Sequence, residues 1–164
     1  MGVLTDYFRA ADAASVVQAL ERADGGPLIG VRHPAFDGVD AKGVDPMVAL
    51  GQFVAVIRGV PWQVELVKET AVWPTTPAPG PDGPEDDDDP WVKGPWVTQL
   101  DTAVRDILAA VHDQDVSKLV AEWVKAEELH GARVEYMQPV AQELIELARR
   151  ARAAEEQLYC WMCL

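Results

Sequence analysis

Short segments at both ends of the chain are rich in apolar and aromatic residues, as β-strands are. Residues 3–9 (VLTDYFR) put Tyr7 on one face and Phe8 on the other, which predicts a short strand. Residues 157–163 (QLYCWMC) have the same extended character. If the two end strands pair, the first and last segments of the chain lie in one small sheet.

Between these strands, apolar residues recur every three to four positions, which is the helical period. Asp12 is a good N-cap for a first helix, which should end at the Gly-Gly-Pro turn of residues 25–27. Asp45 followed by Pro46 is a strong start for a second helix over residues 46–58. This second helix is apolar nearly all round, so we expect it in the centre of the fold.

Other segments have less regular patterns. Residues 28–44 are rich in glycine and predict a loop, whereas residues 64–72 suit either a short helix or a strand. Residues 74–95 hold seven of the twelve prolines and the run EDDDDP, so little apolar surface can be buried there. We therefore predict a single domain over residues 1–164, with 74–95 inserted as a solvated, mobile loop.

Three more helices are predicted after this loop. One starts at Thr98, with Asp101 as its capping partner; one runs from about residue 115 to His130; and one spans residues 139–154. Combined with the end strands, these patterns predict an α+β fold. It consists of a small sheet that includes the N- and C-terminal strands, packed against about five helices.

The net charge of −13 narrows the classes of function. Nucleic acids and anionic membranes both require a cationic protein surface, so neither is expected as a partner. A basic protein is the partner that electrostatics favours. The N-terminus lacks the apolar core of an export signal and the chain has two cysteines, so we expect a cytoplasmic protein.

The charged loop supplies the candidate partner-binding surface, which consists of Asp86, Asp87, Asp88, Asp89, Trp91 and Trp96. We expect the two tryptophans to anchor the loop onto the core, and direct contact with a partner is the alternative. The acidic run lacks the spacing and the glycine of a calcium loop, so a solvated charge run is expected.

Cys160 and Cys163 have the C-x-x-C spacing of redox and zinc sites. Reactive thiol pairs of this kind usually start a helix, but here only Leu164 follows. In a strand, side chains three residues apart lie about 10 Å apart and point to opposite faces. We therefore expect two small buried thiols, and a metal shared between two chains is the alternative.

His112-Asp113 is the other candidate metal-binding motif, with His33 as a conceivable distant partner. The doublet falls where one predicted helix ends and the next begins, and there histidine suits the helix dipole and aspartate suits capping. The chain has no phosphate-binding glycine loop, serine-nucleophile motif or zinc-protease motif. No cofactor is predicted.

The layout of the chain resembles a known family. The opening MGVLTDYFRA and residues 39–59 resemble a Met-Gly strand followed by a lead into a buried helix, with Asp40 and Lys42 in that lead. Residues 96–123 and 140–164 resemble paired helices and a closing helix and strand. This order is similar to that of the YfbM-like proteins, also called domain of unknown function 1877. The resemblance implies an α+β fold and supplies no catalytic residues.

These observations favour a non-catalytic cytoplasmic binding protein, with an immunity- or antitoxin-like role as one form of it. The alternative is a metal-dependent enzyme or thiol protein that uses His112 and Asp113 or the two cysteines. A third reading is a small-ligand pocket lined by tryptophans, for which the candidates are Trp62, Trp73, Trp123 and Trp161.

Overall fold

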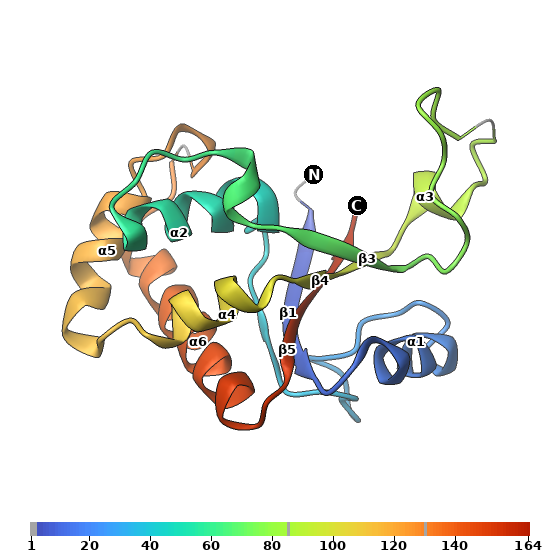
Figure 1. The fold of residues 1–164 in the computed structure, drawn as a ribbon, viewed down its shortest axis with the longest axis horizontal. Coiled ribbons are helices and arrows are strands. Elements are labelled where there is room, and N and C mark those ends of the chain that lie inside the picture. The colour runs from blue at the N-terminus through green and yellow to red at the C-terminus, as the bar shows by residue number, and fades with distance from the viewer. Residues whose placement is uncertain (1–2, 85, 130) are drawn as a thin grey trace.

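Five strands form one antiparallel sheet in the computed structural model, which describes residues 3–84, 86–129 and 131–164. The strands are β1 (Leu4–Ala10), β2 (Gly38–Asp40), β3 (Glu69–Trp73), β4 (Trp96–Leu100) and β5 (Gln157–Cys163). Their order in the sheet is β2-β1-β5-β4-β3, so the first and last strands lie side by side (Figure 1). The α+β prediction and the pairing of the end strands are confirmed.

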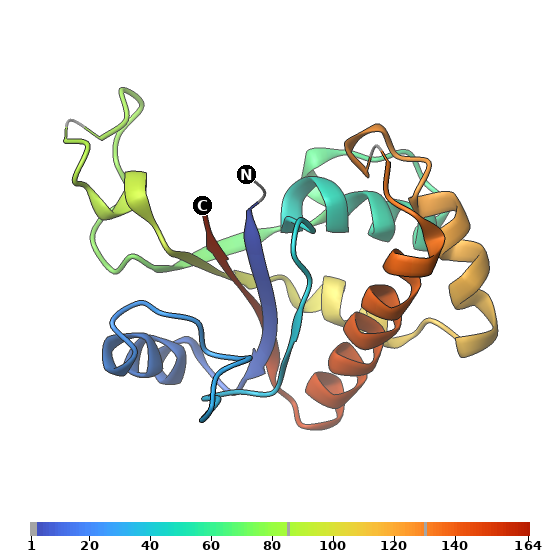
Figure 2. The same ribbon diagram turned by 180° about the vertical axis from the view of Figure 1, so that it is seen from behind.

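Helices cover both faces of this sheet (Figure 2). They are α1 (Ala13–Arg22), α2 (Gly51–Arg58), α3 (Pro90–Lys93), α4 (Thr102–Ala109), α5 (Val116–Trp123) and α6 (Val134–Ala153). The face that packs against α2, α4, α5 and α6 is called the helical face, and the opposite one the α1 face. In the described part of the chain, no helix is both long and apolar enough to cross a bilayer.

Alternation along the end strands sends neighbouring side chains to different cores. Tyr7 and Cys160, opposite each other in β1 and β5, belong to the core of the helical face. Phe8 and Tyr159, the next pair, stack at 5.6 Å between ring centroids in the core of the α1 face. Both faces of the central strands are therefore buried, which fixes their register.

The second predicted helix has the central position expected from its apolar surface. Its first turn, Pro46–Leu50, is a π-helix that runs directly into α2, and the Asp45 carboxylate accepts hydrogen bonds from the backbone N–H groups of Val48 and Ala49 at 2.7 and 3.2 Å. Trp123 of α5 is fully buried and packs on this segment, where its Nε1 donates to the carbonyl of Ala49 at 2.8 Å.

The prediction of a helix starting at Thr98 is wrong, because residues 96–100 form β4. Leu100 matched the helical period, but it is buried as a strand residue on the helical face. Asp101 is the actual N-cap of α4 and accepts a hydrogen bond from the N–H of Ala103 at 3.1 Å. Asp101 was predicted as the partner of a cap at Thr98, and it is instead the cap itself, so the helix starts at Thr102.

Three other boundaries differ from the predictions. Strand β2 lies within the predicted loop of residues 28–44, and it is only three residues long. Helix α6 begins at Val134, five residues before Pro139, which sits inside the helix. The missing N–H of this proline leaves a carbonyl in the first exposed turn, where water can reach it. Helix α5 ends at Trp123, and His130 lies outside the described residues.

Candidate functional site

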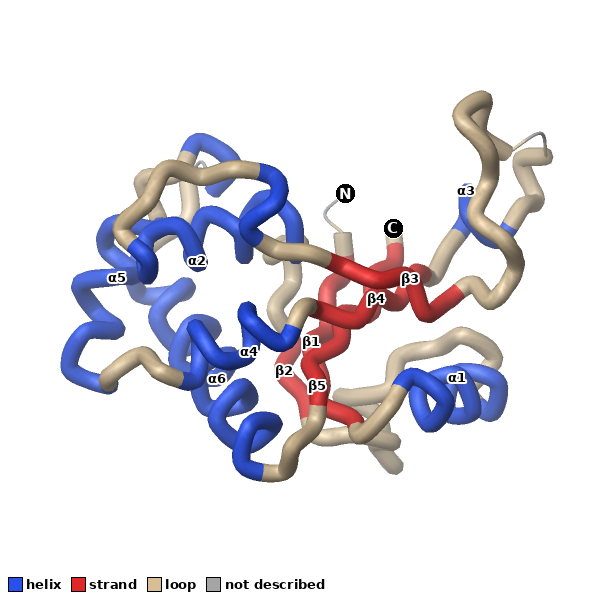
Figure 3. The backbone as a smooth tube through the Cα atoms, in the orientation of Figure 1, coloured by secondary structure: helices blue, strands red, loops and turns tan. Residues whose placement is uncertain are grey.

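The acidic residues that the sequence singled out lie on a projection of the structure. Residues 74–84 and 86–95, here called the arm, lie between β3 and β4 in the chain and extend beyond the sheet (Figure 3). Asp86, Asp87 and Asp88 are exposed on the arm, and Asp89 is half-buried. The arm therefore carries its carboxylates away from the body of the fold.

Hydrogen bonds within the arm hold it in shape. The indole Nε1 of Trp91 donates to the backbone and side-chain oxygens of Thr76 at 3.2 and 3.1 Å. Trp96 Nε1 donates to the carbonyl of Trp91 at 3.0 Å. The sequence favoured the interpretation that these tryptophans anchor the loop onto the core. Their polar atoms bind other parts of the arm, which gives the arm more order than its composition predicts.

Some of the aspartates also serve local structure. Asp89 caps α3 by accepting a hydrogen bond from the N–H of Trp91 at 2.7 Å. Asp86 accepts one from the N–H of Asp88 at 2.9 Å, and Asp88 forms an ion pair with Lys93. Asp87 lies between them with its side chain exposed. The acidic run is therefore partly scaffold and partly a solvent-facing charged surface.

The base of the arm rests on the turn that follows α1. Gly25 in this turn has a φ of +74°, and a Cβ there would lie 3.3 Å from Cγ of Pro95, at the end of the arm. Its carbonyl accepts a hydrogen bond from Trp161 Nε1 at 3.0 Å. Both the backbone conformation and the close approach favour a glycine at this position.

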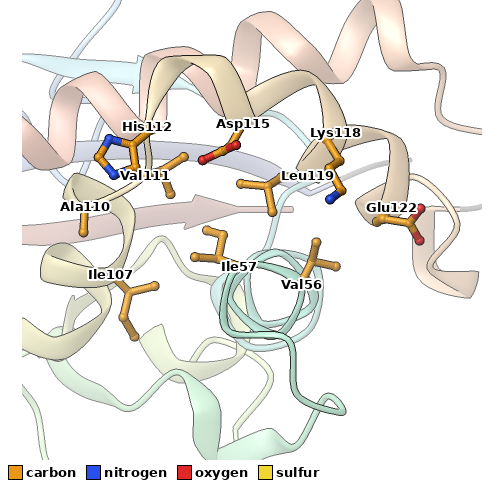
Figure 4. A pocket seen from close by; sticks show the side chains of 10 residues that line it. All are labelled: Val56, Ile57, Ile107, Ala110, Val111, His112, Asp115, Lys118, Leu119 and Glu122. Atoms are coloured by element: carbon orange, nitrogen blue, oxygen red, sulfur yellow. The ribbon is translucent and has the colours of Figure 1, made fainter.

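A second candidate site is the α2–α5 groove, a hollow of about 400 Å³ between α2, α4 and α5 (Figure 4). Figure 4 shows its apolar floor and polar rim, lined by Val56, Ile57, Ile107, Leu119, His112, Asp115, Lys118 and Glu122. The charged groups lie along the rim with both signs interspersed, so the groove has no concentrated charge to select a ligand.

The candidate pair His112 and Asp113 does not converge on one point. His112 lines the α2–α5 groove, whereas the carboxylate of Asp113 pairs with Arg149 at 2.8 Å. His33 lies beside α1, across the sheet from both. Within residues 3–84, 86–129 and 131–164, no three His, Cys, Asp or Glu side chains are grouped as a metal site requires. Of the two residues, only Asp113 links the junction between α4 and α5 to another element, through its ion pair with Arg149 of α6.

The two thiols of the C-x-x-C motif lie on opposite faces of β5. Cys160 is fully buried on the helical face, and Cys163 is half-buried and packs on the α1 face. Both are free thiols. Burial raises the pKa of the Cys160 thiol well above its ordinary value, so it is protonated at neutral pH. The prediction of an extended tail with diverging thiols is confirmed, whereas the prediction that both thiols are buried is wrong for Cys163, which lies near the end of the strand.

A pair of aspartates on the α1 face was missed at the sequence level. Asp6 of β1 lies directly opposite Asp40 of β2, and both line a cavity of about 250 Å³ together with Ile29 and Trp161. Burial, and secondly the charge of Asp40, raises the pKa of Asp6 from 3.8 to about 6. Only the cross-strand register brings these residues together, and no local motif signals it.

Comparison with known proteins identifies no relative: no family model matches the chain, and neither does any curated protein or solved structure. The layout resemblance to the YfbM-like family stays a prediction.

Proposed function

We propose that this chain is a non-catalytic, cytoplasmic binding protein that captures a basic partner through its acidic arm. The observation that carries the proposal is that the arm extends away from the sheet and is held in one shape by its own hydrogen bonds. Asp86, Asp87 and Asp88 stand exposed on a segment whose shape is held by the Trp91–Thr76 and Trp96–Trp91 hydrogen bonds. Ordering the arm in advance lowers the entropic cost of binding.

Charge supports the same conclusion. The chain has a formal net charge of −13, and a surface of one sign attracts partners of the other sign over a distance comparable to the Debye length. An immunity- or antitoxin-like protein, which neutralises a basic partner by occupying its surface, is one role of this kind. The proposal needs no catalytic constellation.

The test separates the arm from the overall charge. We would replace Asp86, Asp87 and Asp88 by asparagine in one variant, and Glu127, Glu143 and Glu146 by glutamine in a matched control. The control residues are exposed on or beside the helical layer, so both variants remove three negative charges. Asparagine retains an oxygen at each position, which keeps the turn bonds of Asp86.

Peptides would then be selected from a random display library on the wild-type protein and on both variants. We expect lysine- and arginine-rich peptides to be enriched by the wild type and by the control, and to be lost with the arm variant. Equal enrichment on all three proteins, or peptides without basic bias, would refute the proposal.

A further inference from the structure

The strand that leads into the arm has an open edge. β3 is the last strand of the sheet and pairs only with β4 among the described strands. The N–H of Asp101 donates to the carbonyl of Lys68 at 2.9 Å, which makes these two residues a hydrogen-bonded pair. Because such pairs alternate along antiparallel strands, the backbone groups of Glu69 and Ala71 face away from β4. They are free to pair with a further strand.

A groove lies next to β3, between this strand and α1, and reaches Gln99 of β4. It has a volume of about 460 Å³ and lies between β3 and α1, so we call it the α1–β3 groove. Its lining is mixed: Ala13, Ala14, Val17, Ala71 and Val72 are apolar, whereas Gln18, Glu21, Thr70 and Gln99 are polar. An edge strand beside a helix, with room between them, is the arrangement in which an extended peptide adds a strand to a sheet.

The two sides of an added strand would meet different chemistry. Side chains on the α1 face would lie over Ala14 and Val17, which suits small apolar residues. Side chains on the helical face would pass the carboxylate of Glu69, which is half-buried and accepts a hydrogen bond from Thr98 Oγ1 at 2.5 Å. Burial raises the pKa of Glu69, so a neighbouring cation would favour its charged form.

The groove is continuous with the arm. β3 ends at Trp73 and the arm begins at the next residue, while the turn after α1 packs against the other end of the arm through Gly25 and Pro95. An extended segment that leaves the groove at this end therefore passes the base of the arm, on the side of Glu21. Carboxylates thus lie both beside the groove and beyond its end.

We propose that the α1–β3 groove binds an extended segment of the basic partner by strand addition to β3. The segment would alternate small apolar residues, facing α1, with lysine or arginine, facing Glu69 and the arm. This inference rests on the proposed function, since it assigns the mode in which the same basic partner is recognised.

The bulge between Ala71 and Trp73, followed by Pro74, limits how far pairing extends. Such features blunt the exposed edges of sheets. They lie at the end of β3 that meets the arm, whereas residues 68–71 contain no proline or bulge. Pairing is therefore expected over four residues, enough for hydrogen bonds on both sides of Glu69 and Ala71.

A defined peptide tests this binding mode. The probe is a capped seven-residue peptide of alternating lysine and valine, and its affinity is measured by fluorescence anisotropy. A second probe carries N-methyl groups on its valines and a third on its lysines. One of the two methylated probes loses the N–H groups that face β3, so we expect it to bind at least roughly tenfold more weakly. Equal binding of all three probes would exclude strand pairing.

Protein variants test the position of the site. Ala14→Arg places a bulky cation in the groove, and Ala153→Arg makes the same change at an exposed position of α6. We expect the Ala14 variant to lose at least roughly tenfold in affinity and the control to bind as the wild type does. Wild-type affinity in the Ala14 variant, or no binding of the probe to the wild type, would overturn the inference.

The outcomes distinguish the groove from the arm. Suppose that the methylated probes bind as tightly as the unmethylated one, and that Ala14→Arg leaves the affinity unchanged while the arm variant abolishes binding. Strand addition is then wrong and the arm proposal stands. If Ala14→Arg weakens binding of the probe and the arm variant leaves its affinity unchanged, the arm proposal fails instead. A wild-type dimer in sedimentation experiments that Ala14→Arg dissociates would show a second copy as the occupant, which contradicts the proposal.

Discussion

Replacing Asp6 by asparagine is expected to stabilise the protein at neutral pH. In the folded chain this carboxylate lies opposite Asp40 and partly out of water, and its pKa is raised from 3.8 to about 6. Between these two values the folded state holds a proton that the unfolded state has released. The free energy of unfolding contributed by this group therefore falls as the pH rises from about 4 through 6.

The magnitude follows from the difference between the two pKa values. About two pH units correspond to about 3 kcal/mol for a group fully shielded from water. Asp6 is only partly buried, so solvent screening reduces the expected gain from Asp6→Asn to about 1 to 2 kcal/mol. Asp40→Asn relieves only the smaller, charge-based cause and should stabilise less.

Urea denaturation of the wild type and of Asp6→Asn at pH 4 and pH 7.5 measures this effect. We expect a clear gain for the variant at pH 7.5 and a much smaller difference at pH 4, where the wild-type carboxyl is largely protonated when folded. A variant that is no more stable than the wild type at pH 7.5, or a gain of the same size at both pH values, would show that the charge of Asp6 does not destabilise the fold.

Three further predictions concern single positions. Ellman's reagent should titrate Cys163 rapidly in the native protein and Cys160 only after denaturation, because burial keeps the latter thiol protonated; two equally fast thiols would contradict this. Gly25→Ala should lower the free energy of unfolding by about 1 to 2 kcal/mol, since it combines a positive φ with a close contact; an unchanged denaturation midpoint would show that the turn is not constrained. Trp123→Phe should lower the free energy of unfolding, measured by urea denaturation, by about 2 to 3 kcal/mol, because it leaves space in the core and removes the donor to the carbonyl of Ala49. A loss no larger than that of a typical surface substitution would contradict the burial of this side chain.

The sequence predicted those parts of the fold that depend on local signals. Asp12 and Asp45 were expected as N-caps, and each accepts hydrogen bonds from the first turn that follows it. Alternation placed Tyr7 and Phe8 on different faces of β1, as found. These features depend on a few neighbouring residues and on a period of 2 or 3.6, so they can be read without tertiary contacts.

Features that depend on contacts distant in sequence were not predictable. Leu100 fits the apolar period of α4, and only its burial in the sheet decides that it belongs to β4. Likewise, Asp6 and Asp40 are 34 residues apart, and a shift of one residue in strand register would separate them. The open edge of β3 follows from the order of the strands, which no local pattern specifies.

The candidate site was predictable in composition but not in arrangement. The acidic run around Asp87 predicts an exposed segment, whatever the tertiary structure of the rest of the chain. The bracing by Trp91 and Trp96 requires the path of the backbone, because their acceptors are set by where Thr76 and Trp91 lie. For Cys160 and Cys163, by contrast, the arrangement itself was predictable. Once their strand is recognised, the pleat alone places their thiols on opposite faces.

Amide chemical-shift mapping during titration with the lysine–valine probe shows directly which surface of the protein binds a basic segment. We predict that the largest shifts occur at Glu69, Ala71 and Val17, with a second group at Asp87 on the arm. Shifts concentrated around Lys118 in the α2–α5 groove, or scattered over every acidic surface alike, would contradict the account.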